Sequence, residues 1–282
     1  MSTSPTAQRR LLASRLRALR EASGLSIEDV AGRLLCSTSK ISRLETGARS
    51  ATARDVRDLA LMYALPAAEQ ETLLTLVQES KQRGWWETYQ DVAARSGQIL
   101  GLEDSAISVQ QYETLLLPGP LQTAAYTRAL LRFTGPDLTS HAVEQYITTR
   151  RERHRKLGAD SPTRYSLVLD EAALRRQVGG APVMVEQLNR LAADAEAGRV
   201  SVQVIPFRTG AHPGMDGPFT ILEFAEPALP DVVYVERRYG QLLLSRPSET
   251  ETFHEAMDHL RGVAEDPDRS VELIKMTARE MG

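Results

Sequence analysis

Residues 34–47 read LLCSTSKISRLETG, and this stretch decides how the first third of the chain is interpreted. An apolar start leads through small hydroxyl residues into a segment with the spacing of a short helix, on which Ile41 and Leu44 share one face. At 100° per residue the opposite face is polar, with Lys40 at its edge. The helix can therefore bury one side and offer the other to a ligand. The polar face consists of Ser39, Ser42, Arg43 and Thr46.

The sequence around this stretch predicts a bundle of short helices. A leucine stripe marks a first helix, and Ser26, with Asp29 three residues later, caps a second one. Thr52 and Asp55 repeat this pattern before a fourth helix, and Pro66 breaks the chain before a fifth. We expect an all-α, five-helix head without strands.

Two helices joined by a tight turn at residues 35–37, the second with a polar outer face, form the helix-turn-helix pattern. The major groove of DNA admits one helix, and a guanidinium such as that of Arg43 can bind a guanine edge. We expect Lys40, Arg49 and Arg54 to contact phosphates, which fixes the register without reading sequence. A helical bundle with a merely polar surface is the alternative.

The charge is unevenly distributed along the chain. Residues 1–60 carry eleven Lys and Arg against six Asp and Glu, a net charge of +5, while the remaining residues carry −8. A basic head on an acidic body is expected when only the head meets a polyanion. A solvated charged face would produce the same asymmetry.

Composition excludes several classes of protein. The single cysteine, Cys36, can form neither an intramolecular disulfide nor a multi-cysteine metal site. No apolar run approaches the roughly 20 residues of a membrane span, and the first residues lack a signal peptide. We expect a cytoplasmic protein that binds no membrane and no cofactor.

Beyond Arg83 the pattern alternates between helix and strand, which predicts an α+β domain with a mainly antiparallel sheet packed against helices. The expected domains are a disordered tail at 1–8, the helix-turn-helix domain at 9–65, a connecting helix at 66–84 and the α+β domain at 85–282. The expected strands are 165–169, 200–207, 218–225, 232–237 and 241–246. The expected helices are 126–133, 142–157, 183–197, 247–264 and 267–281.

Residues 13–65 resemble an XRE-type, phage-repressor-like DNA-binding domain, through LSIEDVAGRL, SKISRLETG and the flanking arginines. The turn departs from the family pattern, because Leu35 stands where a glycine is usual. A left-handed conformation would cost leucine about 1–2 kcal/mol. The resemblance implies that the base-reading positions are Ser37, Thr38, Ser39 and Arg43.

The rest of the chain resembles antitoxin-like XRE regulators of actinomycetes. Those proteins join a DNA-binding head to a large domain of uncharacterised function, often beside a gene for a small partner protein. The resemblance implies transcriptional regulation but supplies no ligand and no catalytic activity. It is carried by Leu116–Leu131, 168–180, 202–224 and 231–236.

Two features of the second domain predict a ligand or partner site. One is an aromatic cluster, whose alternative role is core packing; the other is the loop GAHPGMDGPF, residues 210–219, whose alternative is a long hairpin connection. Glycines and prolines in this loop favour close approach of a partner at a small entropic cost. The predicted site residues are Trp85, Trp86, Tyr89, His212, Met215 and Phe219.

No arrangement of residues predicts an enzyme. Asp170 and Glu171 are neighbours, so they do not face each other on a helix, and Asp170 suits an N-cap. His254 and His259 are five apart, which is not the spacing of a zinc-binding helix, so we expect surface histidines and no metal.

We therefore expect a homodimeric regulator that binds a palindromic operator in double-stranded DNA and receives a small-molecule or protein signal. A rival hypothesis is an antitoxin-like module that holds a small partner protein and represses its own operon. An enzyme fused to a DNA-binding head is the third.

Overall fold

The computed structural model describes residues 4–158, 161–237 and 240–282. None of the helices in these ranges combines the length and apolar composition needed to cross a membrane. The chain forms two compact units. The N-terminal unit comprises Met1–Glu87, Gly97–Ser105 and Phe224–Pro230, and the sheet unit comprises Thr88–Ser96, Ala106–Glu223 and Asp231–Gly282.

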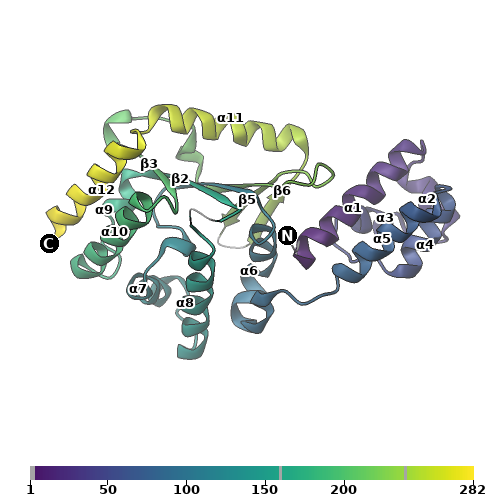
Figure 1. Cartoon of the computed structure of the whole chain (residues 1–282), viewed down its shortest axis with the longest axis horizontal. Helices are drawn as coiled ribbons and strands as arrows, with labels where there is room; N and C mark the ends of the chain where they lie inside the picture. Colours follow the sequence, from purple (N-terminus) through teal and green to yellow (C-terminus); the bar gives the residue numbers. More distant parts are fainter. Residues whose placement is uncertain (1–3, 159–160, 238–239) are drawn as a thin grey trace. The chain divides into compact units, whose positions relative to one another are not determined.

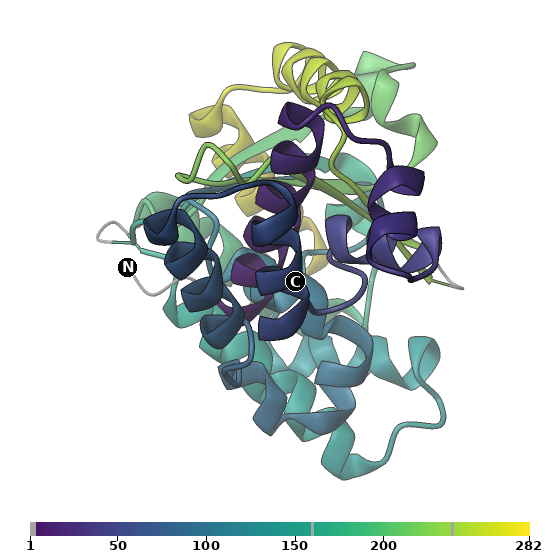
Figure 2. The same cartoon turned by 90° about the vertical axis from the view of Figure 1, so that its right-hand side faces the viewer.

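The N-terminal unit is helical, as expected, and Figure 2 shows its helices in purple and blue. It is larger than the expected head, because it also contains part of α6 (Gln90–Glu103), most of the 3-10 helix η1 (Trp85–Thr88) and residues 224–230. Five consecutive helices alone therefore do not make up this unit. They are α1 (Pro5–Ala22), α2 (Ile27–Arg33), α3 (Thr38–Glu45), α4 (Ala53–Met62) and α5 (Ala67–Glu79).

Local hydrogen bonds start the helices where the sequence predicted. Ser26 Oγ accepts from Asp29 N at 3.0 Å, and Asp29 Oδ2 accepts from Ser26 N at 2.9 Å, which completes a capping box before α2. Thr52 and Asp55 form the same box before α4. These caps satisfy backbone N–H groups that a helix start otherwise leaves unpaired.

The start of α1 corrects the expected tail. Residues 5–8 are helical, since Ser4 Oγ caps α1 and proline stands at its first position. Ser4 N also donates to Ser105 Oγ at 2.7 Å, and the side chain of Ala7 is completely buried. Capping and burial together order this segment. Residues 1–3 lie outside the described part of the chain.

The core of the N-terminal unit gathers apolar side chains from every one of these helices. Leu12, Val30, Ile41 and Val56 are at most 1% exposed, and Leu229 joins them from the segment 224–230. The predicted apolar stripes are therefore the buried faces. Burial of such stripes, rather than propensity, supplies most of the stability of short helices.

The sheet unit is built on six strands in the order β3-β2-β1-β4-β5-β6. β1 pairs in parallel with β2, and β2 with β3, whereas the other neighbouring pairs are antiparallel. The strands are β1 (Ser108–Glu113), β2 (Arg164–Asp170), β3 (Ser201–Ile205), β4 (Phe219–Glu223), β5 (Val232–Arg237) and β6 (Gly240–Leu244).

The expectation of a mainly antiparallel sheet was wrong: the sheet is mixed. Strand β1 was not among the predicted strands, because its sequence SVQQYE does not alternate apolar and polar residues. With β1 in place, the segment between β1 and β2 becomes a helical crossover, and a second helical crossover, which holds the expected helix 183–197, joins β2 to β3. Crossovers of this length join parallel strands, while tight turns join antiparallel ones.

Helices cover both faces of this sheet (Figure 1). α11 lies over one face, where its Met257 and Leu260 pack with Tyr112, Ile221 and Val233, and α7 and α8 lie on the other. The helices of the unit are α7 (Ala124–Thr134), α8 (Ser140–Arg155), α9 (Glu171–Arg175), α10 (Ala181–Glu196), α11 (Pro247–Val263) and α12 (Pro267–Met281). Between β3 and β4 lie the 3-10 helices η3 (Phe207–Thr209) and η4 (Pro213–Asp216).

Candidate nucleic-acid interface

The predicted recognition helix is α3, and its two faces differ as the sequence indicated. Ile41 and Leu44 are buried, whereas Thr38, Ser39 and Arg43 are exposed. Ser37 is the N-cap, and its Oγ accepts from Lys40 N at 3.2 Å. The free N–H groups and the positive dipole end at this terminus favour a nearby anion such as a phosphate.

Arg43 lies along the exposed face of α3. Its Nε donates to Ser39 O at 3.1 Å, which restrains the side chain on the helix surface. Within the described residues this is the side chain's one polar contact, so the terminal guanidinium nitrogens can donate to a ligand. A guanidinium held in this way suits the bidentate geometry of a guanine edge.

The three residues expected to contact phosphates differ in their exposure and in their ion pairs. Arg49 is exposed, and the Arg54 side chain is 89% exposed at 3.8 Å from Asp58. Lys40, in contrast, forms an ion pair with the buried Asp55 at 2.5 Å. Burial raises the pKa of Asp55, but hydrogen bonds from Lys40 and Thr52 outweigh it and lower the pKa overall. Lys40 therefore links α3 to α4.

The turn between α2 and α3 confirms the expected strain at Leu35. Its φ is +50°, and its backbone N donates to Gly32 O at 3.3 Å while Cys36 N donates to Ala31 O at 3.0 Å. These two bonds define the Schellman ending of a helix, in which glycine usually holds the left-handed position. Leu35 is also 95% exposed, so no burial compensates the strain.

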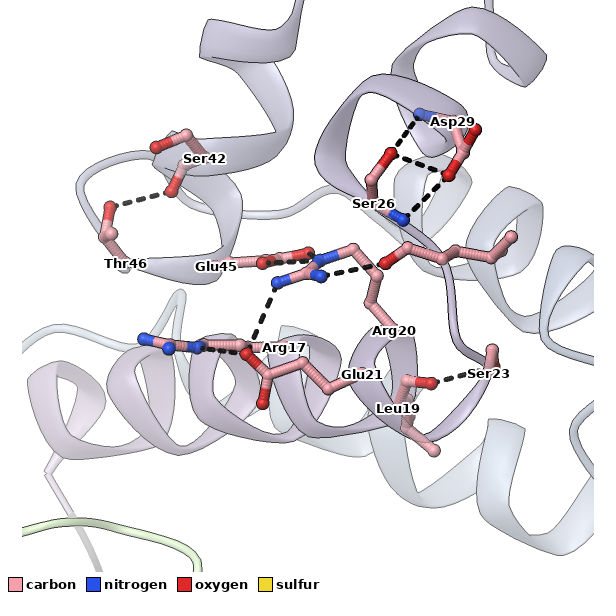
Figure 3. A network of polar contacts seen from close by, with 11 residues as sticks. Arg17, Leu19, Arg20, Glu21, Ser23, Ser26, Asp29, Ser42, Glu45 and Thr46 are labelled. Carbon is pink, nitrogen blue, oxygen red and sulfur yellow. Dashed lines mark hydrogen bonds and ion pairs between the residues drawn. The ribbon is translucent and has the colours of Figure 1, made fainter.

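A buried ion pair fixes the end of α3 against α1. Arg20 Nε lies 2.8 Å and 3.0 Å from the two carboxylate oxygens of Glu45, and Arg20 Nη1 donates to Leu25 O at 2.9 Å (Figure 3). The hydrogen bond to Glu45 raises the pKa of Arg20 against the effect of burial. Sequence spacing did not reveal this pair, since its members are 25 residues apart.

The residues of the predicted ligand cluster are divided between the two units. Trp85 and Trp86 belong to the N-terminal unit, whereas Tyr89 and the loop 210–219 belong to the sheet unit. Trp86 is 3% exposed and packs so closely against Gly84 and Gly101 that a Cβ on either glycine would overlap its ring. Core packing, the alternative role for the aromatic cluster, therefore describes Trp86.

Within the loop 210–219 two of the three predicted residues point inward. The His212 side chain is 5% exposed, with Nε2 at 3.5 Å from Asp170 Oδ2, and Phe219 packs on Phe253. Met215 is 70% exposed. The ring of Tyr112 lies edge-on to that of His212. The sequence analysis missed this residue because it did not predict strand β1, to which Tyr112 belongs. Burial raises the pKa of Tyr112 well above its usual range.

Comparison with known families agrees with this two-part architecture. Residues 11–73 match a family described as "Helix-turn-helix domain", the class to which the geometry of α2 and α3 points. Residues 96–276 match the family described as "Domain of unknown function (DUF5753)", and since they form more than half of the chain, the chain belongs to that family. No curated protein and no solved structure matches. The helix-turn-helix domain indicates DNA binding.

Proposed function

We propose that this protein is a sequence-specific transcriptional regulator of the XRE type that places α3 in the major groove of DNA. The exposed polar face of α3 carries the proposal, because Ser39 and Arg43 are open to solvent and so are Ser37 and Thr38 at the start of the helix. In helix-turn-helix proteins the N-terminal residues of the second helix contact base edges. Ser37, Thr38, Ser39 and Arg43 would read bases, and Arg49 and Arg54 would bind phosphates.

Footprinting on the DNA upstream of the protein's own gene tests the proposal. We expect a protected palindrome, and we expect Arg43→Ala to lose about 1–3 kcal/mol on that site and to relax discrimination at one base pair. Arg132→Ala, which removes an exposed charge from α7, is the matched control and should bind normally. Full specific binding by the Arg43 variant would refute the assignment of α3.

We further propose that the protein acts as a homodimer. One helix-turn-helix head spans a few base pairs, so selective binding in a genome requires two heads on half-sites about one helical turn apart. Light scattering should therefore give twice the mass of 31.2 kDa at micromolar concentration. A monomer that protects a single half-site would contradict this part.

The sheet unit is proposed to receive a small-molecule or protein signal, and no reaction is assigned to it. An antitoxin-like role is the second candidate. The sheet unit exposes Phe133, Phe207 and Met215, which are residue types that protein interfaces favour. Co-expression with the product of a neighbouring gene, followed by size-exclusion chromatography, separates the two. A stable complex that Phe133→Ser abolishes favours partner capture.

A further inference from the structure

Three side chains of the sheet unit bring possible metal ligands together. Glu223 ends β4, Asp231 directly precedes β5 and His254 lies on α11. Their ligand atoms all lie within 4.8 Å of one another, and His254 Nε2 is 3.2 Å from Asp231 Oδ2. The histidines of α11 were expected on the surface without a metal role because of their spacing, which could not reveal two carboxylates supplied from elsewhere in the chain.

The pairing of β4 with β5 makes a cation at this point favourable. Leu222 pairs with Val232, so one step further the register places Glu223 opposite Asp231. Like charges directly opposite each other destabilise a strand pair. In the described part of the chain His254 is the one ionisable partner of this pair. A divalent cation would compensate both carboxylates at once.

We propose that Glu223, Asp231 and His254 bind a divalent first-row transition metal ion, with Zn²⁺ or Mn²⁺ as its representatives. One imidazole nitrogen and two carboxylate oxygens form a mixed donor set that suits these ions better than Mg²⁺, which prefers oxygen ligands and keeps its water. Three protein ligands leave room for water in the remaining positions. All three residues are partly buried, so an ion can enter from solvent.

The position of the site links it to the DNA-binding unit through the chain itself. Glu223 and Asp231 flank residues 224–230, which belong to the N-terminal unit. There Leu229 is buried in the helical core, and Glu226 lies 3.6 Å from Arg15 of α1. An ion that joins Glu223 to Asp231 fixes the two ends of this segment.

The same segment lines a pocket of the N-terminal unit. A cavity of about 370 Å³ lies between α1, α5 and the segment, and its lining includes Leu11, Leu76, Glu79 and Leu229. We infer that metal binding adjusts how residues 224–230 pack in the helical core. This regulatory consequence rests on the proposed DNA-binding function, whereas the metal site itself does not.

Calorimetric titration of the metal-free, untagged full chain with ZnCl₂, MnCl₂ and MgCl₂ tests the site. We expect one equivalent of Zn²⁺ or Mn²⁺ to bind and to raise the melting temperature. His254→Ala and Asp231→Asn should weaken binding more than about tenfold, because loss of a residue that only supports a metal ligand already costs about that much. His259→Ala, an exposed histidine of the same helix, is the control and should bind normally.

Two results would overturn the site. One is the absence of Zn²⁺ and Mn²⁺ binding by the wild type; the other is wild-type affinity in both variants. If His254→Ala lowers the melting temperature equally with and without metal, the cluster is an ion pair only, and the proposal fails.

Operator affinity with Zn²⁺ and with EDTA tests the regulatory consequence. We expect a metal-dependent change in the wild type and none in His254→Ala. If metal binds without changing operator affinity, the metal site is supported but its regulatory role is refuted. Absence of any operator binding refutes the proposed function, and the calorimetry still decides the metal site.

Discussion

The guanidinium of Arg20 and the carboxylate of Glu45 form a buried ion pair that joins the end of α1 to the end of α3, with Nε 2.8 Å and 3.0 Å from the two oxygens. Both side chains are nearly inaccessible. Removal of one partner leaves the other charge buried and unpaired. Through this pair a residue of α1 holds the C-terminal end of α3.

Arg20→Ala should therefore lower the free energy of unfolding by about 3–5 kcal/mol. The exposed pair Arg17–Glu21, at 2.9 Å on the same helix, offers the control, and Arg17→Ala should cost less than about 1 kcal/mol. Urea denaturation of the full chain measures both. Equal losses in the two variants would contradict the assignment of Arg20–Glu45 as the stabilising pair.

Leu35→Gly should stabilise the protein. Glycine relieves the left-handed strain at φ +50°. This relief exceeds the entropy that glycine adds to the unfolded chain, so we expect a gain of about 0.5–1 kcal/mol. Since Leu35 is exposed, the substitution loses little burial.

The reverse change at a matched position is the control for Leu35→Gly. Gly24 ends α1 with the same pair of hydrogen bonds at φ +68°, and a Cβ there would meet no other atom within 4 Å. Gly24→Ala should therefore destabilise through backbone strain alone. Thermal denaturation measures the melting temperatures of both variants. A lower melting temperature for Leu35→Gly than for the wild type would show that Leu35 is not strained.

Lys40→Ala should reduce stability rather than the salt dependence of DNA binding. Its ammonium group pairs with Asp55 in the folded protein, so its loss leaves a buried carboxylate without its partner. Arg49→Ala and Arg54→Ala should each reduce the slope of log affinity against log salt by about one. Titrations between 50 and 200 mM salt measure the slopes. An equal reduction with Lys40→Ala would restore Lys40 as a phosphate contact.

Glu113→Gln should change how stability depends on pH. Burial raises the pKa of Glu113 to about 8, with a further contribution from Glu236, against a hydrogen bond from Gln111. The folded protein keeps a proton that the unfolded chain releases above about pH 4.3, so stability falls as the pH rises from there to 8.

We therefore expect the melting temperature of the wild type to fall between pH 5 and pH 8, and that of Glu113→Gln to fall less. The amide preserves an acceptor for Gln111 Nε2, which donates to Glu113 Oε1 at 2.7 Å. Glu251→Gln on the exposed side of α11 is the control and should follow the wild type. Parallel curves for all three proteins would refute the ionisation of Glu113 as the cause.

Trp86→Ala should destabilise the N-terminal unit by about 3–5 kcal/mol, because it removes a large buried side chain packed between two glycines. Met215→Ala, at an exposed loop position, should leave the melting temperature unchanged. If Trp86→Ala melts like the wild type but loses regulation in cells, the indole binds a ligand instead.

Much of the helical unit could be predicted from the sequence, because short-range interactions decide it. The capping boxes at Ser26 and Thr52 join residues three apart, and the buried stripe of α3 follows from helix periodicity. The left-handed conformation of Leu35 was suggested by the family resemblance, in which a glycine is usual at this position of the turn. Such features depend on neighbours within one or two turns.

The sheet was harder to predict, because strand order depends on contacts between distant segments. β1 has too few apolar residues to be recognised alone, and its identity as a strand depends on pairing with β2 and β4. Without β1 the chain after residue 200 reads as a series of hairpins. The predicted strands were correct as elements, and β4–β5 and β5–β6 are antiparallel as expected, but β2 and β3 pair in parallel.

The site residues also fall into two groups, those whose position follows from local sequence and those that only the fold brings together. The sequence by itself determined which side of α3 is polar, since periodicity specifies which residues share a helix face. Only the tertiary structure decided that Lys40 pairs with Asp55 and that His212 lies beside Tyr112. It also decided that Glu223 and Asp231 meet His254. These neighbours are separated by long stretches of chain, and packing of the whole fold, not local spacing, brings them together.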